Sequence, residues 1–257
     1  MPTISRNRQI GRLADPLNDQ VHQKLLWALM TGRYKPGVRL SIRTVARALK
    51  VGEMPVREAL KRLSNQRALE AMPSRAFRVP TMSPERIAGL FDIRRRLEGY
   101  AAAMAVPKMS VRQIERLRAV HSTMLAAVER EDTAGYLESN YAFHFIVYTS
   151  CGNVDLVALI ETVWVQTGPF LAGILDQYHF TEEWRASHMH IIEAVVARDP
   201  QSAQAAIEED IDWGTKYFLD LKERSDVMSG SPERPKAPNA RVHHIPPRAQ
   251  FPRDLRQ

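Results

Sequence analysis

This 257-residue sequence contains four side chains of types that can bind a metal ion: two histidines, an asparagine and an aspartate. Asn140 and His144 are four residues apart, so they share one face of a helix. His188 and Asp210 follow in later segments with helical periodicity. Two imidazoles and one carboxylate suit Zn, Mn, Fe or Ni, with waters or a ligand carboxylate completing the shell. The alternative is that both histidines are hydrogen-bonded core residues without a metal.

A second group of residues has the chemistry of nucleic-acid binding. Arg57 and Lys61 lie one helical turn apart, opposite an apolar stripe. The Arg57 guanidinium can fork onto a guanine edge or a phosphate, and the Lys61 ammonium suits a phosphate. Arg43, on a preceding helix, would lie over the DNA backbone, and Arg75 would reach the minor groove. A basic amphipathic helix on an ordinary protein surface is the alternative.

The charges are distributed unevenly along the chain. Residues 1–80 hold 16 Lys and Arg against 5 Asp and Glu, whereas residues 81–221 hold 12 against 20. The last segment, residues 222–257, holds 8 against 4. A basic N-terminal part on an acidic body indicates that one end of the protein meets a polyanion and the other end does not.

The composition is that of a soluble globular protein, with 44% hydrophobic and 25% charged residues. A secretory signal requires an apolar segment after its basic residues, and none follows the basic N-terminal residues here. No run reaches the roughly 18 uninterrupted apolar residues of a membrane helix. Cys151 is the single cysteine, so no intrachain disulfide can form. These features favour a reducing cytoplasm and give no reason to expect a membrane.

Hydrophobic periodicity predicts the elements that position the basic residues. It predicts three helices, over residues 18–30, 42–49 and 53–66. On the third helix, Glu58 and Arg62 are four residues apart and are expected to form a local ion pair. Two short strands follow, with Arg75 at the tip between them. This order predicts a winged helix-turn-helix over residues 18–80, after an N-terminal arm of residues 1–17.

The remainder of the chain is predicted to be helical. Six helices are expected, over residues 84–105, 110–130, 133–150, 153–176, 182–198 and 200–221. Their short links favour a compact all-helical bundle over residues 81–223. Residues 224–257 are rich in proline and poor in apolar side chains, which predicts a disordered basic tail. The predicted fold class is therefore mainly α, a winged helix-turn-helix followed by an α-bundle.

Three segments of the basic part occur in a characteristic order. They read GRYKPGVRL at 32–40, VARAL at 45–49 and PVREALKRL at 55–63. This order resembles the DNA-binding domain of GntR-family bacterial transcription regulators, and the helical remainder is similar to the FCD ligand-sensing domain of the FadR subfamily. The resemblance implies a homodimer that binds a near-palindromic operator in double-stranded DNA. It also implies a response to a small organic acid, with repression more usual than activation.

The resemblance assigns roles to individual residues of the helical part. An FCD metal site has an Asp and a His four residues apart, a His on a later helix and a His on the last helix. His144 and His188 match, whereas Asn140 stands where the Asp is usual and Asp210 where the last His is usual. A neutral amide is a weak ligand, and Asp210 supplies the carboxylate that Asn140 lacks. Arg94 matches an arginine that often faces the effector pocket in similar domains, where it would clamp a carboxylate by two hydrogen bonds.

The predicted reading helix departs from the family at Glu53, where relatives have an arginine that contacts DNA. A carboxylate is favoured at a helix N-terminus, but it repels phosphate. It can instead accept a hydrogen bond from cytosine N4. The resemblance therefore implies DNA contacts by Arg43, Arg57 and Arg75, and the exchange at position 53 implies a shifted operator preference.

Three functions of different classes are compatible with these features. The favoured one is a DNA-binding regulator that responds to a metabolite. The second is a metalloenzyme with a water activated at His144, His188 and Asp210, for which Glu193 and Cys151 are the candidates for a further catalytic group. No motif supports such a group, and the basic N-terminal part would be unused, so we expect no enzyme activity. The third is a constitutive DNA-binding protein whose helical part only dimerises.

Overall fold

The computed structural model describes the backbone of residues 17–73, 76–175 and 182–228. Side chains are described for residues 17–73, 76–171 and 186–216. The predicted N-terminal arm up to residue 16, Arg75 and the tail from residue 229 lie outside the described residues.

The N-terminal part combines helices with a small antiparallel sheet. Its elements are α1 (Leu17–Met30), β1 (Arg39–Ser41), α2 (Ile42–Leu49), α3 (Glu53–Asn65), β2 (Glu70–Met72) and β3 (Ala76–Arg78). The strand order is β1-β3-β2, and Phe77 of β3 lies opposite both Leu40 and Ala71. The three predicted helices and two predicted strands are confirmed. The sequence did not predict β1, because its pairing with β3, which defines it as a strand, joins segments that are far apart in the sequence.

Capping residues mark where α2 begins and ends and where α3 begins. The Ser41 hydroxyl accepts a hydrogen bond from the Thr44 N–H at 3.1 Å, which starts α2. The helix ends at Lys50, which adopts the left-handed conformation with φ of 54°. Gly52 precedes α3 without a side-chain cap. The first turn of α3 therefore has backbone N–H groups, and the Glu53 carboxylate beside them, open to a partner.

The C-terminal part is a helical bundle. Its elements are α4 (Pro84–Ala105), α5 (Val111–Glu129), α6 (Thr133–Thr149), α7 (Val154–Leu175), α8 (Glu182–Val196) and α9 (Pro200–Met228). All six predicted helices are confirmed, and so is the mainly α fold class. However, α9 continues to Met228, so residues 224–228, which were predicted to begin the disordered tail, are helical. A segment poor in apolar residues can still extend a helix when, as here, it contains good helix formers.

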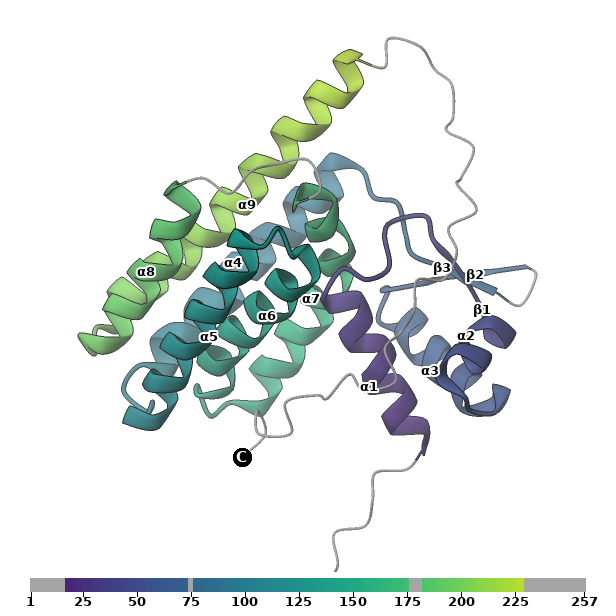
Figure 1. Ribbon diagram of the computed structural model, residues 1–257, viewed down its shortest axis with the longest axis horizontal. Coiled ribbons are helices and arrows are strands. Elements are labelled where there is room, and N and C mark those ends of the chain that lie inside the picture. Colours follow the sequence, from purple (N-terminus) through teal and green to yellow (C-terminus); the bar gives the residue numbers. More distant parts are fainter. Residues whose placement is uncertain (1–16, 74–75, 176–181, 229–257) are drawn as a thin grey trace, which may run out of the picture.

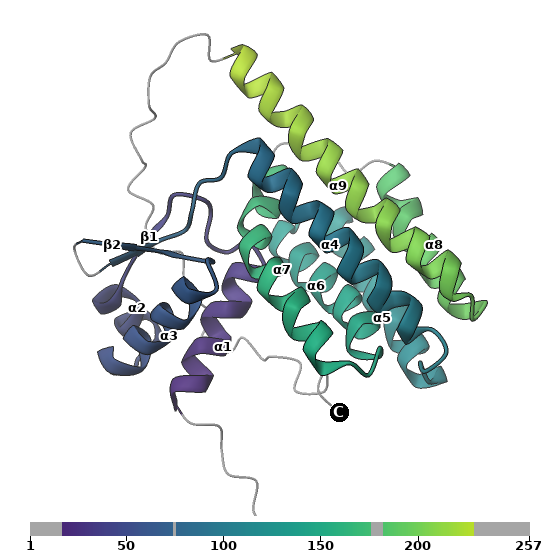
Figure 2. The same cartoon turned by 180° about the vertical axis from the view of Figure 1, so that it is seen from behind.

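Each helix of the bundle packs against two or more others. In Figure 1 and Figure 2, α4 and α9 run side by side along one face, and α6 and α7 lie between them and the N-terminal part. In the described part of the chain, α7 alone is long and apolar enough to cross a membrane by length and composition, over Val154–Leu171. Since 56% of that window is buried, α7 has the burial of a core helix in a soluble bundle.

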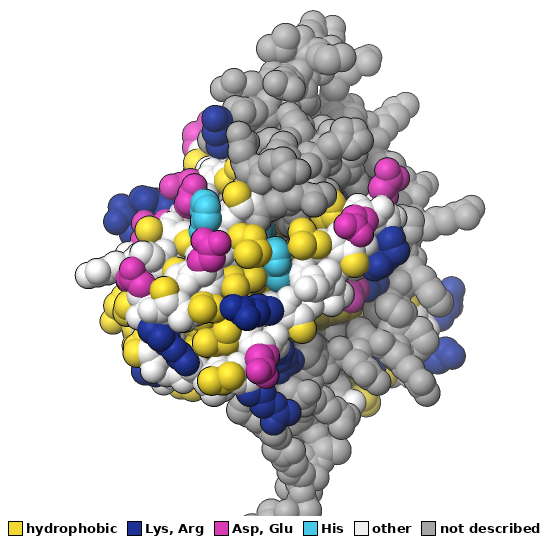
Figure 3. All heavy atoms as spheres, turned by 60° about the vertical axis from the view of Figure 1, so that its left-hand side comes forward, with side chains coloured by type: hydrophobic (Ala, Val, Ile, Leu, Met, Phe, Trp, Pro, Cys, Tyr) yellow, Lys and Arg dark blue, Asp and Glu magenta, His cyan; other side chains and the backbone are white. Residues whose placement is uncertain are grey.

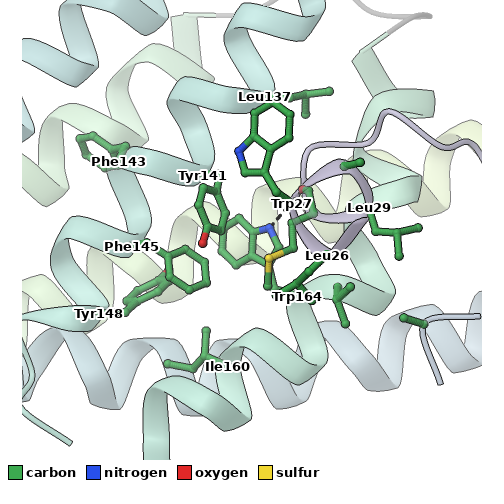
Figure 4. Close-up of a cluster of buried hydrophobic side chains, with 14 of the residues drawn as sticks. Leu26, Trp27, Leu29, Leu137, Tyr141, Phe143, Phe145, Tyr148, Ile160 and Trp164 are labelled. Carbon is green, nitrogen blue, oxygen red and sulfur yellow. Dashed lines mark hydrogen bonds between the residues drawn. The ribbon is translucent and has the colours of Figure 1, made fainter. Parts of the chain in front are cut away.

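Helix α1 belongs to the core of both parts. Trp27 lies beside Trp164 of α7 (Figure 4), and the Trp164 indole N–H donates to the Met30 carbonyl at 3.4 Å. An added Cβ at Gly168 of α7 would lie 2.5 Å from the Leu29 carbonyl oxygen, so only glycine allows this approach. Buried residues of the two parts form one continuous hydrophobic cluster. The N-terminal part is therefore packed against the bundle as well as connected to it.

Candidate DNA-binding surface and metal centre

Helix α3 has one buried face and one exposed face. Val56, Leu60 and Leu63 are fully buried on the inner face. On the other side, Arg57 is half-buried and Lys61 is exposed. Arg57 has no ion-pair partner among the described residues, so its guanidinium remains available for a ligand. The structure thus places both basic side chains on the solvent side of a helix that the core holds in place.

The ion pairs of α3 differ from the predicted one. Glu58 contacts Lys61 at 3.4 Å, and Arg62 instead binds Asp19 of α1 at 2.6 Å. The expected Glu58–Arg62 pair is therefore wrong. Sequence spacing shows which residues share a helix face, but it does not show that a neighbouring helix offers a better-placed carboxylate. The Arg62–Asp19 pair helps to fix α3 against α1.

Two further exposed residues flank the start of α3. Arg43 is exposed on α2, and Glu53 is exposed in the first turn of α3. Met54 was not predicted as a functional residue, although it is a large apolar side chain with 65% exposure beside Glu53. Its signal in the sequence is its position off the apolar stripe of the helix. Apolar side chains at this position of a reading helix can contact thymine methyl groups.

His144, His188 and Asp210 come together inside the bundle. One potential ligand atom from each lies within 4.8 Å of the other two. His144 Nε2 is 3.4 Å from Asp210 Oδ2, and His188 Nδ1 is 3.6 Å from Asp210 Oδ1. Ligands at about 2 Å from a tetrahedral metal are about 3.3 Å apart, so these separations suit a single ion. The residues are contributed by α6, α8 and α9.

Hydrogen bonds set which histidine nitrogens face Asp210. Asn140 Oδ1 lies 3.2 Å from His188 Nε2, and the Ser187 hydroxyl donates to Asp210 at 2.8 Å. The amide oxygen accepts the Nε2 proton, which leaves His188 Nδ1 with a lone pair toward Asp210. Asn140 therefore lies at the centre as predicted, but as a partner of His188 outside the three-residue cluster.

His144 is oriented by a similar contact on its other side. Its Nδ1 lies 3.1 Å from the Tyr148 hydroxyl, which donates its own proton to Glu98 at 2.6 Å. The hydroxyl oxygen can therefore accept the Nδ1 proton, and His144 Nε2 is left as the ligand atom. Neither Glu98 nor Tyr148 was predicted, because residue spacing alone does not show which helix faces meet in the core.

Burial and charge keep His144 and Asp210 in the protonation states that a metal needs. Burial lowers the pKa of His144 to about 3, so its imidazole is neutral near pH 7. Burial alone would raise the pKa of Asp210, but His188, His144 and the Ser187 hydrogen bond outweigh it and hold the pKa below its ordinary value. Neutral imidazoles and an ionised carboxylate are the forms that bind metals. The residues present therefore fit a divalent ion.

Arg94 lies next to this centre but is already paired. Its guanidinium donates to both oxygens of the buried Glu98, at 2.7 and 3.2 Å, and stacks 4.2 Å from the Trp164 ring centre. Burial works to lower the pKa of Arg94, but the pairing with Glu98 raises it overall. An incoming carboxylate would meet the guanidinium edges that Glu98 leaves unused.

Arg96 contacts Asp92 in an exposed ion pair, whereas Arg95 is half-buried and contacts Asp92 as well as Glu208 and Asp212 of α9. His190, two residues after His188 and on a different face of α8, is half exposed and contacts Glu209 at 3.6 Å.

Comparison with known protein families agrees with this arrangement. Residues 17–79 match the gntR family of bacterial regulatory proteins, and residues 89–212 match the FCD domain. The chain belongs to the GntR family. In this GntR protein the first match covers the winged helix-turn-helix, and the second covers the bundle with all three residues of the cluster.

Similar proteins are regulators with the same organisation. The HTH-type transcriptional regulator McbR of Escherichia coli is 28% identical over 212 residues, which cover 81% of this chain and 93% of McbR. The repressor GlaR of the same species is 24% identical, covering 70% and 86%. The solved structure of E. coli McbR/YncC has a TM-score of 0.77 at 27% identity, over 81% of this chain and all of that one. These relatives are transcription regulators, which favours that class over the metalloenzyme alternative for this GntR protein.

Proposed function

We propose that the protein is a cytoplasmic repressor that binds a palindromic operator as a homodimer and releases it when a small carboxylate binds in the bundle. The observation that carries the proposal is α3, whose apolar face is fixed in the core while Arg57 and Lys61 face solvent. In a helix-turn-helix, such side chains enter the major groove. Arg43, Glu53 and, at the wing tip, Arg75 complete the proposed DNA contacts.

An exposed apolar face on the bundle supports the homodimer. Ile93 and Tyr100 of α4 are 46% and 56% exposed, and Leu159 of α7 is 55% exposed. Helix α4 packs against both α7 and α9. Large apolar side chains exposed on adjoining helices favour burial against a partner, and a second copy of the same surface satisfies this by two-fold symmetry.

The proposed effector site is centred on His144, His188 and Asp210. These residues would hold one divalent Zn, Mn, Fe or Ni ion, and such an ion acts as a Lewis acid toward a carboxylate oxygen. Asn140 and Tyr148 orient the two imidazoles, and Arg94 offers its remaining N–H groups to the same ligand. Each of these groups is buried or nearly so, which excludes competing water.

The charges of the site favour an effector with a single carboxylate. Arg94 contributes one positive charge, and Glu98 and Asp210 contribute one negative charge each, so the protein groups sum to −1. A divalent ion changes the sum to +1, which one carboxylate neutralises. A dicarboxylate would bring a second, unbalanced charge into a buried site, and this is costly.

Effector binding would act on DNA through the packing of α1 against α7. An effector that prefers one arrangement of the bundle shifts the population toward it, and α1 transmits the change to α3. The constitutive alternative predicts no saturable binding of any small acid. Titration of metal-loaded protein with monocarboxylates distinguishes the two functions.

Operator binding and metal content together test the proposal. Fluorescence anisotropy with the operator, selected from random duplexes, is expected to give strong and salt-dependent binding. Elemental mass spectrometry of untagged protein, purified without chelator, is expected to give one metal per chain. A His144→Ala/His188→Ala variant should lose the metal, and His190→Ala is the matched control. Absence of specific DNA binding would overturn the regulator; absence of metal would overturn the effector site alone.

A further inference from the structure

A groove of about 390 Å³ lies between α5 and α8, on the face shown in Figure 3. Its volume falls within the range of small-molecule sites. It is lined by Arg118, His121, Ser122, Met189, Ile192, Glu193 and Val196. None of these residues belongs to the cluster of His144, His188 and Asp210, so the groove is distinct from the effector site proposed above.

The lining of the groove combines opposite charges with an apolar wall. Arg118 of α5 and Glu193 of α8 are both exposed, and neither has an ion-pair partner among the described residues. Met189, Ile192 and Val196 follow one face of α8 and form the apolar wall. The groove therefore offers one cation, one anion and a hydrocarbon surface, and its net charge is zero.

His121 supplies a buried polar group without a partner. The side chain is only 5% exposed, and its Nε2 has no hydrogen-bond partner in the described part of the chain. Its ring stacks on the His188 ring at 6.3 Å with an interplanar angle of 18°. Buried polar atoms are normally hydrogen-bonded, so this nitrogen beside the groove has a hydrogen bond left to offer a bound molecule. One imidazole separates the groove from the proposed metal centre.

We propose that this groove binds a zwitterionic α-amino acid with an aliphatic side chain. Its carboxylate pairs with Arg118, its ammonium group pairs with Glu193, and its side chain lies on the wall of Met189, Ile192 and Val196. A small rotation of His121 brings its ring nitrogen to the ligand. A simple acid would leave Glu193 unpaired and repelling, and a simple amine would do the same with Arg118.

Isothermal titration of the full-length protein with L-leucine tests the proposal. The two comparison ligands are 4-methylpentanoate, which lacks the ammonium group, and 3-methylbutylamine, which lacks the carboxylate. L-leucine is expected to bind one molecule per chain, and each comparison ligand is expected to bind at least about tenfold more weakly. Arg118→Gln and Glu193→Gln should each weaken L-leucine binding by a similar factor. Arg112→Gln and Glu115→Gln, exposed on α5 outside the groove, are the matched controls.

Measurements on the His144→Ala/His188→Ala variant separate this site from the metal centre. L-leucine binding is expected to persist in the variant, with or without added Zn²⁺. Loss of binding in that variant alone would assign the ligand to the metal centre and overturn the proposal. Equal binding of L-leucine and 4-methylpentanoate, or no binding of L-leucine, L-valine or L-methionine, would overturn it as well. DNA binding is not part of this assay, so its outcome is independent of the regulator function.

Discussion

Asn140 Oδ1 lies 3.2 Å from His188 Nε2, and this contact turns the other nitrogen of the ring toward Asp210. A neutral amide at this position therefore acts on the metal centre through a histidine. The carboxylate of the centre comes from Asp210, which lies on α9, the last helix of the bundle. Of the two departures that the family resemblance implies, the one at position 140 removes a carboxylate ligand and the one at position 210 exchanges an imidazole for a carboxylate.

Removing the amide should weaken metal binding without abolishing it. In Asn140→Ala, His188 loses the acceptor that fixes its tautomer, and Zn²⁺ affinity is expected to fall about 10- to 100-fold. Competition with a chromophoric chelator measures the change. His190→Ala, on the exposed face of the same helix as His188, should leave the affinity unaltered. An unchanged affinity in Asn140→Ala would mean that the hydrogen bond does not orient the ligand.

The two basic residues of α3 should differ in what they contribute to operator binding. Arg57→Ala is expected to cost about 1–3 kcal/mol and to relax preference at one base pair. Lys61→Ala should weaken all duplexes alike and reduce the salt slope by about one. Arg96→Ala, on the surface of the bundle, is the control. If Lys61→Ala changes sequence preference and Arg57→Ala does not, the assigned roles are reversed.

Two glycines on helices should respond to alanine in opposite directions. At Gly168 the new methyl would lie 2.5 Å from a carbonyl oxygen of α1, so we expect destabilisation of about 1–3 kcal/mol. At Gly89 nothing lies within 4 Å, so alanine should stabilise α4 by about 0.5–1 kcal/mol. Urea unfolding measures both changes. Equal effects at the two positions would contradict the close approach of α7 to α1.

Acid should destabilise the DNA-binding part through His22. Burial, with a contribution from Arg62, lowers the pKa of His22 below its ordinary value of 6.5. The unfolded chain therefore binds the proton more readily, so stability is complete above about pH 6.5 and falls as the pH drops below it. The loss should approach about 1.4 kcal/mol per pH unit until His22 protonates in the folded state.

Urea unfolding at pH 7.5 and 5.5 measures this loss. In His22→Gln the group cannot titrate, so the difference in unfolding free energy between the two pH values should shrink. The exposed His190→Gln is the control and should behave as the unmodified protein. A difference that His22→Gln leaves unchanged would assign the acid sensitivity to other groups.

Local patterns predicted the elements and failed where distant segments meet. Helices such as α3 and α4 were predictable because their apolar periodicity and caps, including Ser83 before Pro84, lie within a few residues. The pairing of Arg62 with Asp19 joins residues 43 apart and has no local signal. β1 was missed for the same reason, since its pairing with β3 is what defines it.

The candidate site also contains residues that the sequence predicted and residues that only the packing of the helices reveals. The residue types and spacing, with the family resemblance, predicted His144, His188 and Asp210, and the structure brings them together. The Arg94–Glu98 pair has helical spacing in the sequence, but whether its face is buried depends on α6 and α7. The roles of Tyr148 and Ser187 depend likewise on how α4, α8 and α9 meet. Arg75 lies outside the described residues, so its minor-groove contact stays a prediction.

Because α1 contributes to a hydrophobic cluster that continues into the bundle, the family boundary near residue 80 does not mark a folding boundary. A fragment that ends there would expose the surface of α1 that now packs against α7, and should aggregate or bind detergent. Heating the whole chain should give one cooperative transition up to the end of the bundle. The DNA-binding part and the helical bundle would then fold and be degraded as one unit, which limits the exchange of either part between relatives.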